Sequence, residues 1–340
     1  MGNKKDYKEI AKKKEQEAYK RIVNIAESFE QSKDKLAEFF EFGTKFYQYS
    51  PRNVMLMLSQ NPNITYVDSF LAWKNRDASV KKGEKGINIL VPVQITYIKD
   101  GKNDKWIKIS DASEEEKQKA KAGLVETRKI QAFKIGNVFD ISQTTFPKEE
   151  YPKIFFMGYT SEMHEKISEA LKEYCVKEHS VQVNEGNVES ISLRGFYRPA
   201  DNSITLNEIM ESTQKLSTLS HEIGHALLHK DSTKSSAQKE FEADAFSIML
   251  SASFGIEIEE TRKDHLSSCY KNFKAEINES DWFKTSLNSF SEVFTTFNEE
   301  IKAINSYVEK YIPKEELEEK KETVDEKNMG FYERKPIKVK

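Results

Sequence analysis

Apolar positions in the first sixty residues recur at intervals of three and four, which is the spacing of an amphipathic helix. In an otherwise charged stretch, Ile22, Ile25 and Phe29 fall on one such side. Ser50 is followed by Pro51, so a capping serine and a first-turn proline mark where another helix begins. The pattern predicts helices over residues 5–30 and 34–47, and a third from Ser50 to the stop at Asn61-Pro62-Asn63.

The period then changes to that of β-strands. Residues 87–93 are rich in Ile and Val and follow a basic turn at residues 81–86. Residues 110–122 are nearly all charged or small, and we expect them to form a mobile insertion. The pattern also predicts a short helix over 66–76, strands over 87–93 and 128–139, and a hairpin that pairs 94–98 with 106–109.

Helical spacing dominates the second half of the chain. Pro147 and Pro152 interrupt the pattern and place a boundary near residues 142–158. Helices are expected over 161–178, 213–229, 236–253, 260–275 and 284–311, with short strands over 181–183, 191–197 and 203–206. We therefore predict an α+β protein with one domain over 1–145, a mainly helical domain with a small sheet over 155–312, and a disordered charged tail over 313–340.

One predicted helix carries the sequence His221-Glu222-Ile223-Gly224-His225. Histidines four residues apart lie on one helical face, so both imidazoles can bind one Zn²⁺ at about 2.0–2.1 Å. Glu222 lies one step around the helix, where it can reach a metal-bound water and act as general base. The motif predicts a zinc metalloendopeptidase in which Glu222 is catalytic and His221 and His225 bind the metal.

A catalytic zinc usually has three protein ligands and a water. The next helix supplies two candidates for the third ligand, Glu240 and Glu242, which point in different directions. We favour Glu240, because it lies on one helical face with Ala243, Asp244 and Ser247, and the small residues of that face would let this helix approach the first one closely. Asp244, one turn later, can accept the second ring N–H of a ligand histidine. His229 is too far along the helix to join the same metal, and we interpret it as a favourable helix-terminal histidine.

Composition limits the class of protein. Cys175 and Cys269 are isolated, as expected for reduced thiols in the cytoplasm, and no secretory signal or apolar run of roughly 20 residues is visible. We expect a cytoplasmic protein without a membrane segment. Charge is uneven, with 28 Lys/Arg against 22 Asp/Glu in residues 1–150 and 25 against 34 in the rest. This asymmetry suggests different partners for the two halves.

The second half resembles the ImmA/IrrE family of metallopeptidases. The resemblance rests on Gly195-Phe196-Tyr197, Ile204-Thr205-Leu206, the motif from Leu219 to His229, and the segment Glu240-Phe241-Glu242-Ala243-Asp244-Ala245-Phe246. It implies a zincin-like fold of the gluzincin type, with zinc on His221, His225 and Glu240. Family members cleave a DNA-bound repressor, which implies a protein substrate. The gap between His225 and Glu240 is short for the family.

The first half resembles the N-terminal single-stranded-DNA-binding domain of ArdC antirestriction proteins. The resemblance rests on Ser50-Pro51-Arg52-Asn53, Gln60-Asn61-Pro62, Ala72-Trp73-Lys74, Val80 to Ile87 and Val138 to Thr144. It implies single-stranded DNA as a partner and an origin on a mobile element. Residues 71–110 also hold nine Lys/Arg against four Asp/Glu. The expected DNA-binding residues are Trp73, Lys74, Lys81, Lys82 and Lys85, which would stack on bases or neutralise phosphates.

Three functions therefore stay open. The first is a zinc peptidase fused to a DNA-binding domain, acting in antirestriction or regulation by cleaving a protein partner. The second is a protein that binds and protects single-stranded DNA without proteolysis, with the zinc domain serving structure or docking. The third is a degenerate zincin that binds a partner protein.

Overall fold

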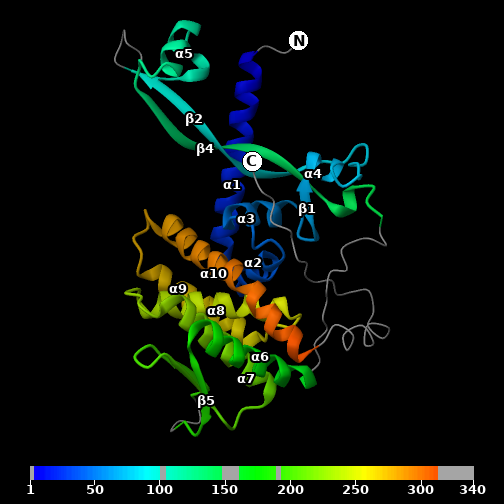
Figure 1. The fold of residues 1–340 in the computed structure, drawn as a ribbon, viewed down its shortest axis with the longest axis vertical. Helices are drawn as coiled ribbons and strands as arrows, with labels where there is room; N and C mark the ends of the chain where they lie inside the picture. Colours follow the sequence, from blue (N-terminus) through cyan, green and yellow to red (C-terminus); the bar gives the residue numbers. More distant parts are fainter. Residues whose placement is uncertain (1–3, 100–104, 148–160, 189–192, 313–340) are drawn as a thin grey trace.

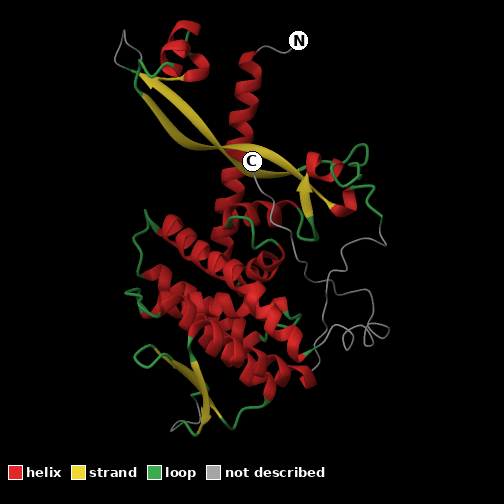
Figure 2. Cartoon of the chain, in the orientation of Figure 1, coloured by secondary structure: helices red, strands yellow, loops and turns green. Residues whose placement is uncertain are grey.

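The computed structural model describes residues 4–99, 105–147, 161–188 and 193–312. Helices and small sheets are mixed, as the expected α+β class requires (Figure 2). The helices are α1 (Lys4–Gln31), α2 (Lys33–Lys45), α3 (Pro51–Gln60), α4 (Phe70–Lys74), α5 (Glu114–Lys121), α6 (Ser161–His179), α7 (Ser212–His229), α8 (Ser236–Ser253), α9 (Glu260–Ala275) and α10 (Trp282–Tyr311). The strands are β1 (Val67–Ser69), β2 (Ile87–Lys99), β3 (Trp106–Lys108), β4 (Thr127–Asp140), β5 (Gln182–Gly186), β6 (Gly195–Arg198) and β7 (Ser203–Asn207), with short 3-10 turns η1 (Ile109–Asp111) and η2 (Ile141–Gln143).

The first sheet is antiparallel, in the order β1-β4-β2-β3. Strands β2 and β4 pair continuously from Ile87↔Val138 to Ile98↔Thr127, and they form a long twisted ribbon that extends away from helices α6–α10 and carries α5 at its outer end (Figure 1). Side-chain amides of α3 bond the β2 backbone: Asn53 accepts from Leu90 N at 2.7 Å, and Gln60 accepts from Asn88 N at 2.9 Å. These bonds fix the inner end of the ribbon to α3.

The structure corrects three local predictions. Residues 66–76 form strand β1 followed by α4, because Ser69 caps α4 by accepting from Ala72 N. The predicted strand over 87–93 and the first arm of the predicted hairpin form a single strand, β2. Residues 114–121 of the expected mobile insertion form α5, since Ser113 and Glu116 make a reciprocal capping box.

Helices from both halves of the chain share one hydrophobic cluster. Phe39 and Phe40 of α2 pack on Phe290 and Phe294 of α10, and Phe40 also contacts Phe241 of α8. Ring centroids in this group are 5.5–6.2 Å apart, as usual for packed aromatic pairs. The N-terminal helices therefore lie directly against the helices that follow the predicted motif.

The second sheet has the order β5-β7-β6, with β7 parallel to β5 and antiparallel to β6. It lies beside α7, at the opposite end of the molecule from the ribbon (Figure 1). The predicted domain boundary falls largely on residues 148–160, and the predicted disordered tail is residues 313–340; both lie outside the described residues. Within the described residues, none of the helices is both long enough and apolar enough to cross a membrane.

Candidate metal centre

The close approach of α7 and α8 creates the candidate centre. Gly224 lies at the contact: a Cβ on this residue would be 3.0 Å from both the Cα and the carbonyl oxygen of Ala243. A glycine facing an alanine removes the side chains that would hold the helices apart. This contact brings the histidines of α7 next to the acidic residues of α8.

His221, His225 and Glu240 meet at this contact, with one ligand atom of each within 4.8 Å of the others. The Nε2 atoms of the two histidines are 3.2 Å apart, and the Glu240 carboxylate oxygens lie 3.4 Å from each. Donor atoms at about 2.0–2.1 Å from a tetrahedral zinc lie about 3.4 Å apart. The observed spacing therefore fits a single divalent metal held by two nitrogens and one oxygen.

Asp244 orients the first histidine. Its Oδ1 accepts from His221 Nδ1 at 2.8 Å, which leaves His221 Nε2 facing Glu240. Arg262 of α9 donates to the same oxygen at 2.7 Å and to the Ser217 hydroxyl at 3.0 Å. The Asp244 side chain is buried, so these charged hydrogen bonds hold it in one position.

His229 and Glu242 form a second chain of hydrogen bonds that begins at the other histidine. The Nδ1 atoms of His225 and His229 are 3.1 Å apart, and His229 Nε2 lies 2.9 Å from Glu242. With His225 Nε2 on a metal, its Nδ1–H donates to His229, and His229 in turn donates to Glu242. His229 ends α7, as expected, but it is buried and bonded on both sides.

Glu242 is fully buried and points away from the candidate centre. Its carboxylate accepts from Lys234 at 2.7 Å, from Gln238 at 2.9 Å and from the Ser289 hydroxyl of α10 at 2.6 Å, in addition to His229. Four donors use both oxygens of this carboxylate, so neither oxygen is directed toward a metal at the candidate centre. The structure thus places Glu240, and not Glu242, beside His221 and His225.

Charge at the site favours ionised carboxylates. Hydrogen bonds from His221 and His225 hold the pKa of Glu240 well below its usual range. Burial would raise the pKa of Asp244, but His221, His265 and Arg262 outweigh it and lower that pKa. Burial would lower the pKa of His221, yet Asp244 and Glu240 raise it to about 9. The ionised carboxylates of Glu240 and Asp244 therefore favour a positive charge at this site, which a bound metal would supply.

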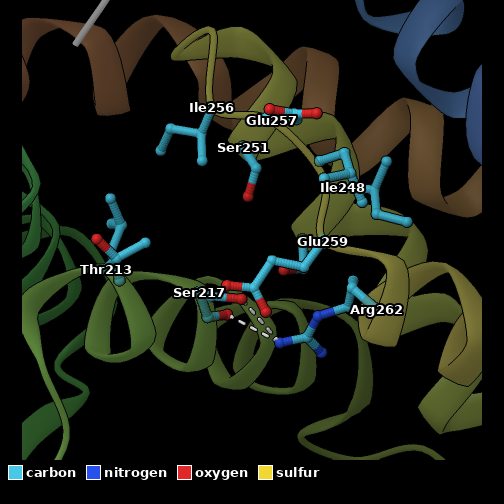
Figure 3. Close-up of a pocket in the computed structure, with 11 residues that line it drawn as sticks. Thr213, Ser217, Ile248, Ser251, Ile256, Glu257, Glu259 and Arg262 are labelled. Atoms are coloured by element: carbon cyan, nitrogen blue, oxygen red, sulfur yellow. Dashed lines mark hydrogen bonds between the residues drawn. The ribbon is translucent and has the colours of Figure 1, made fainter. Parts of the chain in front are cut away.

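Glu222, the expected catalytic residue, follows His221 on α7 and is buried. A small pocket of ≈ 30 Å³ is lined by the first turns of α7, by the last turns of α8 and by the segment that leads into α9. Figure 3 shows Arg262 reaching from α9 to Ser217 at the floor of this pocket, while Ile248, Ser251 and Ile256 line its other side. Arg262 therefore lines this pocket and also bonds the buried Asp244.

Three residues of α9, Arg262, His265 and Cys269, lie beside the candidate centre without having been expected there. His265 Nδ1 lies 2.5 Å from Asp244 Oδ2, and Cys269 Sγ lies 3.8 Å from the His265 ring nitrogens. The i, i+4 spacing of His265 and Cys269 was a visible signal for a metal-binding pair. No spacing rule, however, relates α9 to Asp244, because that contact depends on how three helices pack.

The five residues expected to bind DNA differ in their exposure to solvent. Lys74, Lys81, Lys82 and Lys85 are exposed. Trp73 is only 1% exposed, and its indole N–H donates to the Phe139 carbonyl at 2.9 Å. Packing by Tyr66 and Phe146 covers the indole, so the structure buries the ring that the sequence was expected to expose for stacking on bases. It is a core residue of the small cluster around β1 and α4.

Two family models match separate parts of the chain. Residues 7–139 match the N-terminal domain of anti-restriction factor ArdC. Residues 176–278 match the IrrE N-terminal-like domain of the M78 peptidases. The N-terminal part of the chain is therefore similar to the ArdC N-terminal domain and the later part to the M78 peptidase domain, in the order that the resemblances predicted.

Individual relatives are distant. An uncharacterized protein of Bacillus anthracis is 27% identical over 282 residues, which cover 78% of this chain and 48% of the relative. The chain thus spans about half the length of that curated relative. Among solved structures, the antirestriction ArdC protein from the R388 plasmid is similar in its metal-free form (17% identity, TM-score 0.44, covering 77% of this chain and 86% of that one). Its Mn(II)-bound form gives 19% identity and a TM-score of 0.43, covering 74% and 84%.

Proposed function

We propose that the chain is a zinc-dependent endopeptidase joined to a single-stranded-DNA-binding region, and that it acts in antirestriction or regulation by cleaving a protein partner. The main support is the spacing of His221, His225 and Glu240, which is that of three ligands around one metal. The general base Glu222 lies on the same helix. Two histidine nitrogens and one carboxylate also favour Zn²⁺ over Mn²⁺, because nitrogen donors bind zinc more tightly.

In this mechanism the bound metal would polarise the peptide carbonyl and acidify a water molecule. Glu222 would accept the proton of that water and deliver it to the leaving amine. Asp244 and Arg262 keep His221 in the tautomer that presents Nε2. His229 does the same for His225 through its bond to Glu242. The protein thereby fixes both ring orientations before a metal arrives.

The test compares wild type with Glu222→Gln. The variant should keep the metal content of wild type, because Glu222 is not a ligand, and should lose at least about 100-fold in cleavage rate. The readout is cleavage of candidate protein substrates incubated with the purified full chain. Equal cleavage by a metal-loaded Glu222→Gln protein would contradict the mechanism.

The DNA-binding part of the proposal rests on the surface around α4. Phe70 is 57% exposed, and Lys74 follows it by one turn of that short helix. Phe70 packs edge-on against Phe139 at 6.3 Å, and the Phe139 ring lies beside Gly86, at the end of the basic turn. An exposed aromatic ring next to exposed lysines suits a single strand, with a base on Phe70 and phosphates on the lysines.

Single-strand binding against salt tests this surface. Replacing Lys81, Lys82 and Lys85 by alanine should weaken binding and reduce the salt slope by about 2, at about 0.7 per lost phosphate contact. A charge-matched control replaces Lys117, Lys119 and Lys121 of α5, at the far end of the ribbon (Figure 1). An unchanged slope in the first variant, or an equal change in the control, would exclude the surface.

The non-proteolytic alternative makes a different prediction. If the chain protects DNA only by binding it, Glu222→Gln should protect DNA from restriction as well as wild type does. If proteolysis is the task, the same variant should bind single-stranded DNA normally and fail to protect. One transformation assay with both proteins separates these outcomes.

A further inference from the structure

A second group of metal-binding side chains lies beside the first. It consists of Asp244 of α8 with His265 and Cys269 of α9, and one ligand atom of each lies within 4.8 Å of the others. His265 and Cys269 are one helical turn apart, so they face the same way. Both sulfur and imidazole nitrogen are preferred ligands of zinc.

The two carboxylate oxygens of Asp244 are divided between the two groups. Oδ1 bonds His221 and Arg262, whereas Oδ2 lies next to His265. A cation on Oδ2 would therefore leave the hydrogen bond that orients His221 in place. Cys269 Sγ lies 3.8 Å from His265 Nδ1, a few tenths of an ångström more than the roughly 3.5 Å between a sulfur at about 2.3 Å and a nitrogen at about 2.0 Å on one tetrahedral zinc, so a small side-chain movement brings the two atoms to that spacing.

We propose that Asp244, His265 and Cys269 form a second site for a thiophilic divalent cation such as Zn²⁺. Three protein ligands leave a fourth position for water or for a group of a bound partner. The Asp244–His265 hydrogen bond of 2.5 Å opens as the cation inserts between the two side chains. The second site shares only Asp244 with the residues that orient the first, and its other ligands, His265 and Cys269, have no role in the proposed peptidase activity.

Its surroundings make it accessible and weaker than the first site. The His265 side chain is 52% exposed, so a cation can enter from solvent without opening the fold. The Arg262 guanidinium, 2.7 Å from Asp244, opposes a second positive charge nearby. The ring centroids of His221 and His265 are 6.3 Å apart, so metal ions at the two sites would repel each other electrostatically. The first site fills first, and the second fills at higher metal concentration.

Cobalt(II) titration of the full chain tests the proposal, because only a thiolate ligand produces a sulfur-to-cobalt charge-transfer band in the near ultraviolet. The first site contains no sulfur. Wild type should bind two equivalents, with the band growing only during the second. Cys269→Ser should lose the band and the second equivalent while it keeps the first, and His265→Asn should behave in the same way.

Two matched variants complete the experiment. Cys175→Ser removes the other cysteine, which is buried in α6, and should keep the band and both equivalents. His225→Ala should lose the first equivalent and keep the band, so failure of the first site is distinguished from failure of the second. A folded wild type without the band at any cobalt ratio, or a band that survives Cys269→Ser, would overturn the proposal.

Discussion

At the residue scale, each histidine of the candidate centre is oriented by a different acidic residue. His221 bonds Asp244 directly, whereas His225 reaches Glu242 through His229. Partners of this kind set ring orientation and raise the basicity of the ligand nitrogen. The arrangement explains why His229, which cannot bind the same metal, is nevertheless buried in the site.

Replacing His229 by phenylalanine should test this role. The ring fills similar space but can neither accept from His225 nor donate to Glu242. Zinc affinity should fall about 10- to 100-fold, as is usual when such a partner is removed. Isothermal titration measures the affinity, and Lys230→Ala on the next, exposed residue is the control. Unchanged affinity in a folded His229→Phe protein would remove His229 from this role.

The sequence predicted the residues that act through spacing and missed those that act through packing. The four-residue intervals that relate His221 to His225 and Glu240 to Asp244 can be seen directly in the sequence. The burial of Trp73 and the contacts of Arg262 depend on elements distant in the chain. The sequence around a tryptophan that is flanked by lysines does not show whether the ring faces solvent or is buried in a core.

At the element scale, the packing of α7 on α8 is the feature on which the centre depends. Gly224→Ala would place a methyl group 3.0 Å from the Ala243 backbone, closer than real contacts usually allow. The helices must separate slightly, which should cost about 1–3 kcal/mol. The shift also moves Glu240 from the histidines, so zinc affinity should fall together with the midpoint of thermal unfolding.

The control for this variant is an alanine on an open glycine. Gly186 has no neighbour within 4 Å of an added Cβ and lies in β5. Gly186→Ala should leave zinc affinity unchanged. If Gly224→Ala binds zinc as tightly as wild type, the spacing of the two helices does not control the site.

The predicted ends of helices agree with the structure where the sequence carries a clear capping or helical pattern. Ser50-Pro51 placed the start of α3 correctly, and the predicted helix over 260–275 matches α9. The break between β1 and α4 was missed because the β1 segment has only three residues and gains its strand partners from β4, far along the chain. Short strands of this kind are defined by pairing more than by their own sequence.

At the scale of the whole molecule, the N-terminal helices and the helices of the candidate centre share one aromatic cluster. Gly43 of α2 shows how tight this contact is, since an added Cβ would lie 2.4 Å from the Phe294 ring of α10. The regions matched by two separate family models are therefore packed through a common interior. A substitution that weakens this contact should therefore destabilise both regions.

Phe290→Ala tests that coupling. The ring is fully buried between α1, α2, α8 and α9, so its loss should destabilise the chain by about 3–5 kcal/mol. Unfolding followed by tryptophan fluorescence and by zinc release should shift to the same lower denaturant concentration. Two separate transitions, with only one of them shifted, would show that the two regions unfold independently.

The most direct measurement of the central claim is the zinc affinity of Glu240→Gln and Glu242→Gln, made in the Cys269→Ser background so that only the first site is counted. Glu240 is 39% exposed and faces the histidines, so its loss should abolish tight binding with little change in stability. Glu242 is fully buried among its donors, so its loss should destabilise the fold strongly and lower the affinity only about 10- to 100-fold through His229 and His225. The reverse pattern, with tight zinc binding kept in Glu240→Gln and abolished in folded Glu242→Gln, would contradict the account.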